Sequence, residues 1–160
     1  MRKKNQSQVK QIIKLITKAS EIGNSLGYPN ILQVGFIKEL IIADKLGHKV
    51  HKTKHDADAT LNNKKYEYLT CFEGGSFQID RLFKSPDYKK EKSLTRITRN
   101  DLFYCVVFSK DRPLEIVSIY EVPTNVILSE VLRQLDVSSN EIAHVSVPIK
   151  FVSSYLICRN

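Results

Sequence analysis

The segment "DLFYCVVFSKDRPLEIVSIYEV", residues 101–122, places two apolar runs on either side of a short charged turn. The turn "KDRP" contains Asp and Pro, residues that favour a reversal of the chain. The first run is apolar at nearly every position, which is typical of a strand buried on both faces. The chain is therefore expected to fold around a hairpin whose first arm is a central strand of a sheet.

The remaining periodicity predicts helices on both sides of a set of strands. Apolar residues recur at the three-and-four spacing of a helix in residues 7–26, 30–47 and 123–137. Strands are predicted in "HKVHK", "HDADATL", "YEYLTCF" and in one or two places within residues 143–157. Residues 73–93 show no clear period, so a long irregular connection with one short helix is expected. This order indicates a mixed α/β (α+β) fold, a small sheet flanked by helices in a single domain over residues 1–160.

The charge balance is informative about partners. Lys and Arg exceed Asp and Glu by 25 to 17, which gives a formal net charge of +8 at pH 7. Such an excess favours nucleic acid as a partner, with an anionic membrane second. Hydrophobic residues make up 42% of the chain, which excludes the low-hydrophobicity signature of disorder.

The chain start and the cysteines bear on the compartment. "MRKKNQSQVK" is basic but leads into an amphipathic segment, so neither a signal peptide nor a membrane span is expected. Cys71, Cys105 and Cys158 are widely spaced among apolar or aromatic neighbours, which predicts reduced, buried thiols and no zinc site. A cytoplasmic protein without a membrane partner is the expectation.

Two acidic residues flank a turn signal. Asp58 and Glu67 lie on either side of Asn62 and Asn63, so a hairpin would bring the two carboxylates toward each other. Two carboxylates at one point suit Mg²⁺, which takes oxygen ligands and often uses only one or two protein carboxylates. Because side chains alternate along a strand, Leu69 shares the face of Glu67. A bland alternative is a half-buried strand with Glu67 in an ion pair.

The stretch "DADATLNNKKYEYL" resembles the signature of the PD-(D/E)xK nucleases, with Ala57 in place of the loosely kept proline and Leu69 in place of the lysine. The chain also looks like the small PvuII-type restriction endonucleases in "ILQV", in the apolar hairpin and in "VPIKFV". This resemblance implies a homodimeric type II restriction endonuclease that cuts both strands of a short symmetric duplex site with Mg²⁺. Asp58 and Glu67 would be catalytic metal ligands. Glu39 in "IKELI" resembles an accessory acidic residue, or is simply helix surface.

Leucine at the usual lysine position leaves three explanations. Leu69 is an inactivating substitution, or the chain is a silent homologue that still binds DNA, or another lysine replaces the missing one. The lysines nearest in sequence are Lys52, Lys54, Lys64 and Lys65. Loss of a cationic group that stabilises the transition state generally costs factors on the order of 10² to 10³. Strong impairment is therefore expected.

DNA contacts are predicted in two segments. The basic residues in the stretch from 84 to 99 are expected to bind phosphates: Lys84, Lys89, Lys90, Lys92, Arg96 and Arg99. Polar side chains after the candidate strand are expected to read base edges: Ser76, Gln78, Asp80 and Arg81. A second loop with Ser139, Asn140 and His144 is a further possibility, or only a turn. The apolar residues of the first helix are expected to serve both core packing and a dimer contact. The alternatives to a nuclease are a non-cleaving sequence-specific DNA-binding protein or silent nuclease subunit, and a basic RNA-binding protein.

Overall fold

The computed structural model describes residues 2–28, 31–52 and 56–159, with side chains from residue 6 onward. The chain divides into two compact units, residues 1–41 and 42–160. The prediction of one domain over residues 1–160 remains a prediction. In the part of the chain that is described, no helix is long and apolar enough to cross a membrane.

The N-terminal unit contains α1 (Arg2–Ser25) and the start of α2 (Val34–Leu46). The helix α1 ends because Gly27 adopts a left-handed conformation, with φ of 82°, that other residues rarely take. The N–H of Tyr28 then donates to the carbonyl of Gly23 at 2.8 Å, which closes the last turn. A Cβ atom at Gly23 would lie 2.9 Å from Ile31, so the chain after the helix packs closely against its end.

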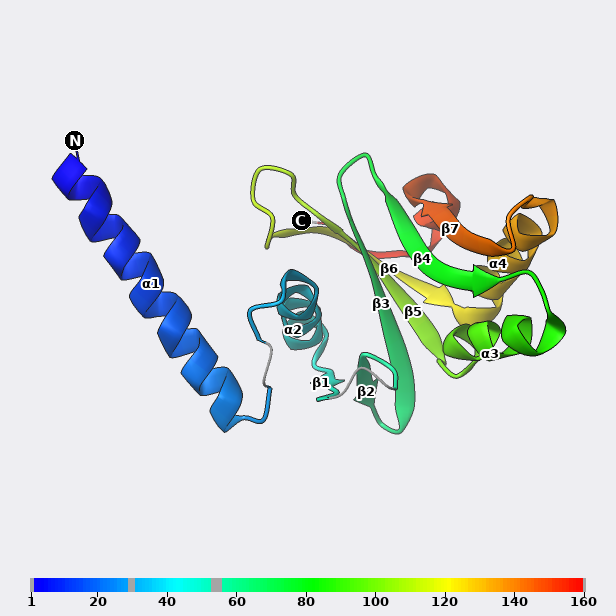
Figure 1. Cartoon of the computed structure of the whole chain (residues 1–160), viewed down its shortest axis with the longest axis horizontal. Helices are drawn as coiled ribbons and strands as arrows, with labels where there is room; N and C mark the ends of the chain where they lie inside the picture. Colours follow the sequence, from blue (N-terminus) through cyan, green and yellow to red (C-terminus); the bar gives the residue numbers. More distant parts are fainter. Residues whose placement is uncertain (1, 29–30, 53–55, 160) are drawn as a thin grey trace. The chain divides into compact units, whose positions relative to one another are not determined.

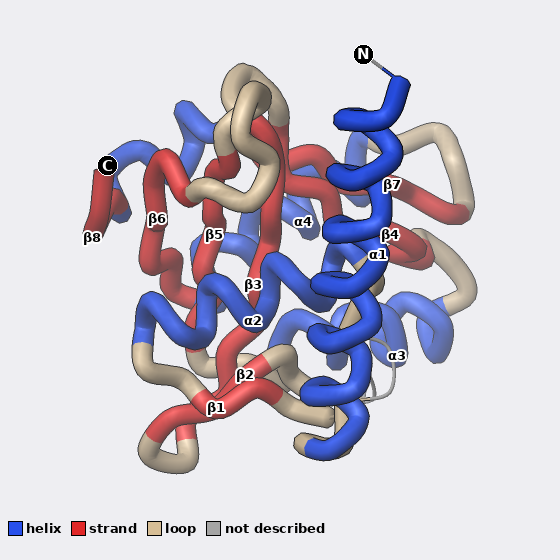
Figure 2. Tube along the Cα trace, turned by 90° about the vertical axis from the view of Figure 1, so that its left-hand side faces the viewer, coloured by secondary structure: helices blue, strands red, loops and turns tan. Residues whose placement is uncertain are grey.

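The C-terminal unit is built on a six-stranded sheet with the strand order β1-β2-β3-β5-β6-β8. These strands are β1 (Lys49–Val50), β2 (Ala59–Leu61), β3 (Lys64–Phe72), β5 (Leu102–Phe108), β6 (Ile116–Pro123) and β8 (Leu156–Arg159). Strands β3 and β5 pair in parallel, and the other neighbouring pairs are antiparallel. Figure 2 shows β3, β5 and β6 side by side. The predicted apolar hairpin is confirmed, because β5 pairs with β6 and lies in the middle of the sheet.

A second layer covers one face of this sheet. It consists of a two-stranded ribbon, β4 (Ser76–Phe83) with β7 (Ile142–Pro148), and of α3 (Asp87–Thr98) and α4 (Thr124–Val137). Figure 1 shows both helices on the ribbon's side of the sheet, and α3 packs against both α4 and β4. A 3₁₀ helix, Ile149–Tyr155, connects β7 to β8. The mixed α+β fold class is thereby confirmed.

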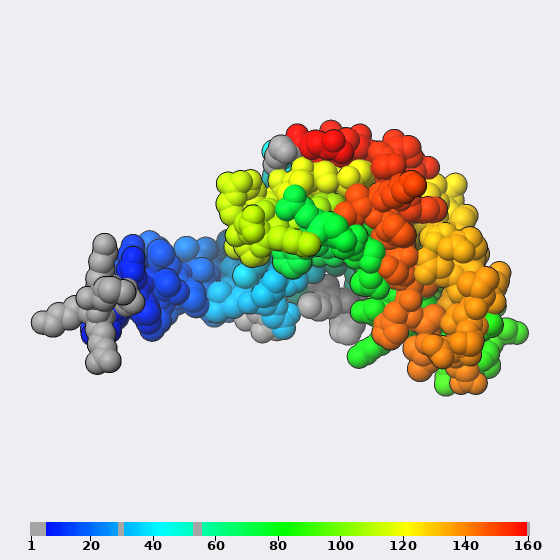
Figure 3. All heavy atoms as spheres, turned by 90° about the horizontal axis from the view of Figure 1, so that it is seen from above, coloured from blue at the N-terminus to red at the C-terminus, as the bar shows by residue number. Residues whose placement is uncertain are grey.

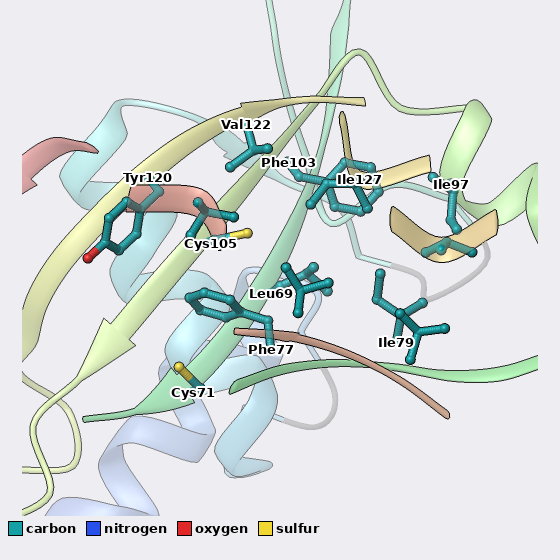
Figure 4. Packing of buried hydrophobic residues seen from close by; sticks show 14 of the residues in the cluster. Leu69, Cys71, Phe77, Ile79, Ile97, Phe103, Cys105, Tyr120, Val122 and Ile127 are labelled. Atoms are coloured by element: carbon teal, nitrogen blue, oxygen red, sulfur yellow. The ribbon is translucent and has the colours of Figure 1, made fainter. Parts of the chain in front are cut away.

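The hydrophobic core lies between the sheet and this second layer. Its largest fully buried side chains include Phe77 of β4, Phe103 of β5 and Ile127 of α4. Figure 4 shows these residues converging from strands and helices that are distant in sequence. Cys71 and Cys105 belong to this core as free thiols, as predicted, whereas Cys158 is only partly buried.

One expectation about secondary structure is wrong. Residues 73–93 are not a long irregular connection, because they contain the eight-residue strand β4 and the first part of the twelve-residue helix α3. Strand β4 was not recognised because Arg81, with φ of 57°, interrupts the pairing with β7 between Ile79 and Leu82 and breaks the alternation of apolar residues. The short strands predicted in "HKVHK" and "HDADATL" are present as β1 and β2, with two and three residues.

Candidate metal and nucleic-acid site

Asp58 directly precedes β2, and Glu67 lies within the neighbouring strand β3. Ala59 of β2 faces Tyr66 of β3, so the antiparallel register continued by one residue sets Asp58 opposite Glu67. The carboxylate Oδ2 of Asp58 accepts the N–H of Tyr68 at 2.8 Å, which fixes it beside the peptide that follows Glu67. The predicted turn between β2 and β3 is confirmed, while the meeting of the two carboxylates at one metal ion remains a prediction.

Leu69 lies on the same face of β3 as Glu67 but in a different environment. Its side chain is 9% exposed and belongs to the core. Figure 4 shows Leu69 near Phe77 and Ile79 of β4. On this face of β3, Glu67 is therefore half-buried, whereas Leu69, two residues later, is packed in the core.

Two cations lie beside the acidic residues. The guanidinium Nη2 of Arg99 is 3.8 Å from Oε2 of Glu67 and donates a hydrogen bond to the backbone carbonyl of Asp56 at 2.9 Å. The ammonium of Lys65 bonds both carboxylate oxygens of Asp56, at 3.0 and 3.2 Å. The hydrogen bond from Lys65, followed by one from the N–H of Ala57, lowers the pKa of Asp56. This end of the sheet therefore alternates negative and positive groups.

Sequence reasoning missed two residues here and placed a third differently. Asp56 belongs to no recognised sequence motif. Arg99 was predicted to bind a phosphate, and its position beside Glu67 was not predicted. The N–H of His51 donates to the carbonyl of Asp58 at 2.9 Å, which places His51 opposite Asp58. Its ring nitrogen Nε2 is buried without a hydrogen-bond partner among the described residues. The only sequence pattern that involves His51 is the alternation of residues 49–51, which is typical of a strand.

The other residues predicted for this site are three lysines and Glu39. Lys52 and Lys64 are exposed, and Lys54 is outside the described residues. Glu39 lies on α2 in the N-terminal unit, so its role as an accessory acidic residue remains a prediction.

The opposite face of β3 carries an aromatic cluster. The ring of His48 stacks on Tyr66, with centroids 4.4 Å apart, and its Nδ1 is 2.7 Å from the hydroxyl of Tyr68. Tyr104 donates a hydrogen bond to Glu121 at 2.7 Å. Burial lowers the pKa of His48 and, with the Glu121 carboxylate, raises that of Tyr104. Tyr68 belongs to this cluster through its side chain and donates its backbone N–H to Asp58, so the cluster is linked to the candidate site.

The predicted base-reading residues lie on the outer face of the β4–β7 ribbon. Ser76 and Gln78 alternate with buried residues on β4, and their side chains join Ser146 of β7 in one hydrogen-bond network of 2.7 to 3.2 Å. Asp80 pairs with His144 across the ribbon at 2.8 Å. In the space-filling view the segment around β7, in orange-red, lies beside the green segment that contains β4 (Figure 3). His144 is therefore a strand residue of this polar face, not part of a turn.

The predicted phosphate contacts differ in what they already bind. Lys84 donates to the backbone carbonyls of Asp136 and Ser138 at the end of α4, so its ammonium has a structural partner. Arg96 donates to the backbone carbonyl of Asp80 at 3.1 Å, and Lys89 lies over the ring of Phe83. Of the remaining basic residues, Arg81 and Lys92 are exposed, and Lys90 is partly buried.

The donor set at Asp58 and Glu67 fits a hard divalent cation in its chemistry. Two carboxylates at facing positions supply oxygen ligands, and Mg²⁺ normally completes its shell with water and phosphate oxygens. No group of three or more His, Cys, Asp or Glu residues suited to a metal ion occurs within the described residues. A Mg²⁺ ion would therefore be held by these two carboxylates together with water and substrate.

Comparison of the chain with protein-family models and with curated proteins gives no match.

Proposed function

We propose that this chain is a PD-(D/E)xK-type, Mg²⁺-dependent type II restriction endonuclease, acting on duplex DNA and impaired in cleavage because Leu69 fills the lysine position. The observation that supports the proposal is the position of Asp58, next to β2, whose carboxylate accepts the N–H of Tyr68, the residue after Glu67 on β3. The polar outer face of the β4–β7 ribbon supports it, since a two-stranded ribbon fits the major groove of DNA.

The residues of the site have separate roles in this proposal. Asp58 and Glu67 hold the metal ion, which supplies Lewis-acid polarisation of the phosphodiester when bound. Tyr68 positions Asp58 through its backbone N–H. The side chains of Ser76, Gln78 and Asp80 contact base edges, and the basic residues of α3 contact the phosphate backbone.

Substitution of Leu69 by lysine tests the nuclease directly. Leu69→Lys is expected to produce discrete plasmid fragments with Mg²⁺, at a rate on the order of 10² times that of the parent chain. Leu69→Met serves as the control, because it keeps the core volume without adding a charge. Thermal unfolding of both variants checks that the core tolerates the change.

A non-cleaving DNA-binding protein on the same fold is the second candidate. The packing of Leu69 in the core favours this candidate, because position 69 then contributes to folding instead of to catalysis. A folded Leu69→Lys variant that binds duplex DNA but leaves the plasmid intact would support this candidate over the nuclease.

The partner proposed for the N-terminal unit is a second copy of the chain. The aliphatic side chains of α1 at helical spacing are 46% to 60% exposed: Val9, Ile12, Ile13, Leu15, Ile16 and Ile22. Several exposed aliphatic side chains on one helix face are typical of a surface that binds another protein. A symmetric duplex site also requires a two-fold protein. We place the dimer contact on this face.

A further inference from the structure

The position of Arg99 is fixed by the end of α3. Arg99 is the C-cap residue, and its backbone N–H bonds the carbonyl of Thr95. The side-chain amide of the buried Asn100 donates to the carbonyls of Arg96 and Ile97 at 2.8 and 3.3 Å. Thr124, at the start of α4, donates to the carbonyl of Asn100 at 2.8 Å. The backbone at Arg99 is therefore held from two helices.

From this position the guanidinium reaches the candidate metal site. Nη2 is anchored on the carbonyl of Asp56 and lies 3.8 Å from the carboxylate of Glu67, a contact longer than a hydrogen bond. The side chains of Arg99 and Glu67 are 25% and 21% exposed, while Nε of Arg99 and Oε2 of Glu67 are buried, so solvent reaches part of each side chain. A planar guanidinium carries five N–H donors in a geometry that matches two oxygens of a phosphate.

We propose that the guanidinium of Arg99 binds a backbone phosphate of duplex DNA beside Asp58 and Glu67. This inference rests on the proposed DNA-binding function. It moves Arg99 from the outer phosphate contacts to the centre of the site.

Duplex binding by the full chain in EDTA tests this role without requiring cleavage. Fluorescence anisotropy with a labelled duplex, over a series of salt concentrations, is measured for the parent chain, Arg99→Gln and Arg99→Lys. Arg112→Gln is the matched control, since this substitution also removes one positive charge and one ion pair. Arg112 lies in the β5–β6 turn and pairs with Glu115 at 2.8 Å. Arg99→Gln is expected to weaken binding about tenfold and to reduce the salt slope by about one unit. Arg99→Lys keeps part of the affinity, and Arg112→Gln is nearly neutral.

Glu67→Gln separates phosphate binding from a purely structural ion pair. If Arg99 binds phosphate, removal of the neighbouring negative charge preserves or raises duplex affinity in EDTA, whereas Arg99→Gln lowers it. Equal losses of affinity and of thermal stability in Glu67→Gln and Arg99→Gln would mean that Arg99 serves only to hold Glu67, and would overturn the inference. Equal affinities of Arg99→Gln and Arg112→Gln would also overturn it while leaving DNA binding intact. A parent chain that binds no duplex would refute the proposed function itself.

Discussion

Single residues on β3 meet sharply different surroundings over short distances. Glu67 lies beside a guanidinium at the edge of the core, while Leu69, two positions on, is packed inside it. Tyr68 between them points to the other face, where it contacts His48, and its backbone holds Asp58. The chemistry available at this strand is thus decided residue by residue, by which side chain from another element meets each position.

The pKa of His48 gives a prediction at this scale. Burial holds that pKa below its ordinary value of 6.5, against the raising effect of Glu121. The unfolded chain therefore binds a proton more readily, so the stability contributed by neutral His48 is present above about pH 6.5 and is lost as pH falls below it. His48→Gln is expected to cost about 1 kcal/mol near pH 7.5, through the lost hydrogen bond to Tyr68, and less at pH 5.

Urea unfolding of the parent chain and of His48→Gln at several pH values measures this difference. His144→Gln is the control, because His144 is exposed on the β4–β7 ribbon. An advantage of the parent chain that grows as the pH falls would show that protonated His48 is stabilised in the fold, contrary to the expectation.

At the scale of elements, α4 forms hydrogen bonds to the β4–β7 ribbon, whereas α1 has exposed aliphatic side chains. Gln134 of α4 bonds both the carbonyl and the N–H of Ser146, at 2.8 and 3.2 Å, and so covers the outer edge of β7. Glu130, whose pKa is lowered by the hydrogen bond from Arg133, accepts a further bond from Gln134 at 2.6 Å. The backbone of the ribbon edge is thereby satisfied at this position. The apolar face of α1, in contrast, is exposed.

The dimer contact on α1 predicts a concentration-dependent mass. The parent chain should have twice the 18.4 kDa chain mass in solution, since pairing buries the aliphatic face of the helix. Ile12→Gln combined with Ile16→Gln is expected to raise the dissociation constant at least about tenfold, because each loses on the order of 1 kcal/mol of apolar burial in both copies. Multi-angle light scattering and sedimentation equilibrium provide the mass.

Lys10→Gln combined with Lys14→Gln is the matched control on the polar face of α1 and should leave the dimer intact. A parent chain that stays monomeric at all concentrations contradicts the placement of the dimer contact on α1. Binding of that monomer to anionic vesicles would instead identify a membrane surface as the partner of the helix.

At the scale of the whole molecule, the charge of +8 makes any nucleic-acid complex sensitive to salt. The logarithm of the duplex association constant should fall linearly with the logarithm of salt concentration, by about 0.9 for each phosphate contact. Competition of labelled duplex DNA with unlabelled duplex and with structured RNA, at one salt concentration, measures the preference. Stronger competition by RNA would contradict the nuclease and favour the RNA-binding alternative.

The sequence predicted the hairpin of β5 and β6 and the turn between β2 and β3, because both follow from local patterns. An uninterrupted apolar run identifies a central strand, and a turn between two short strands sets their register. It did not predict β4, since the irregular pairing at Arg81 removes the period-two signal. Nor did it predict that Arg99 neighbours Glu67, which is 32 positions earlier in the chain.

The sequence by itself determined the mixed α+β class, the central hairpin and the turn that pairs β2 with β3, since alternation and turn chemistry act between near neighbours in the chain. Only the tertiary structure decided that Leu69 is core, that the end of α3 brings a guanidinium to Glu67, and that β7 completes the polar face of β4. The physical reason is that packing and ion pairing depend on distance in space, and the crossing of helices over a sheet joins residues that share no local pattern.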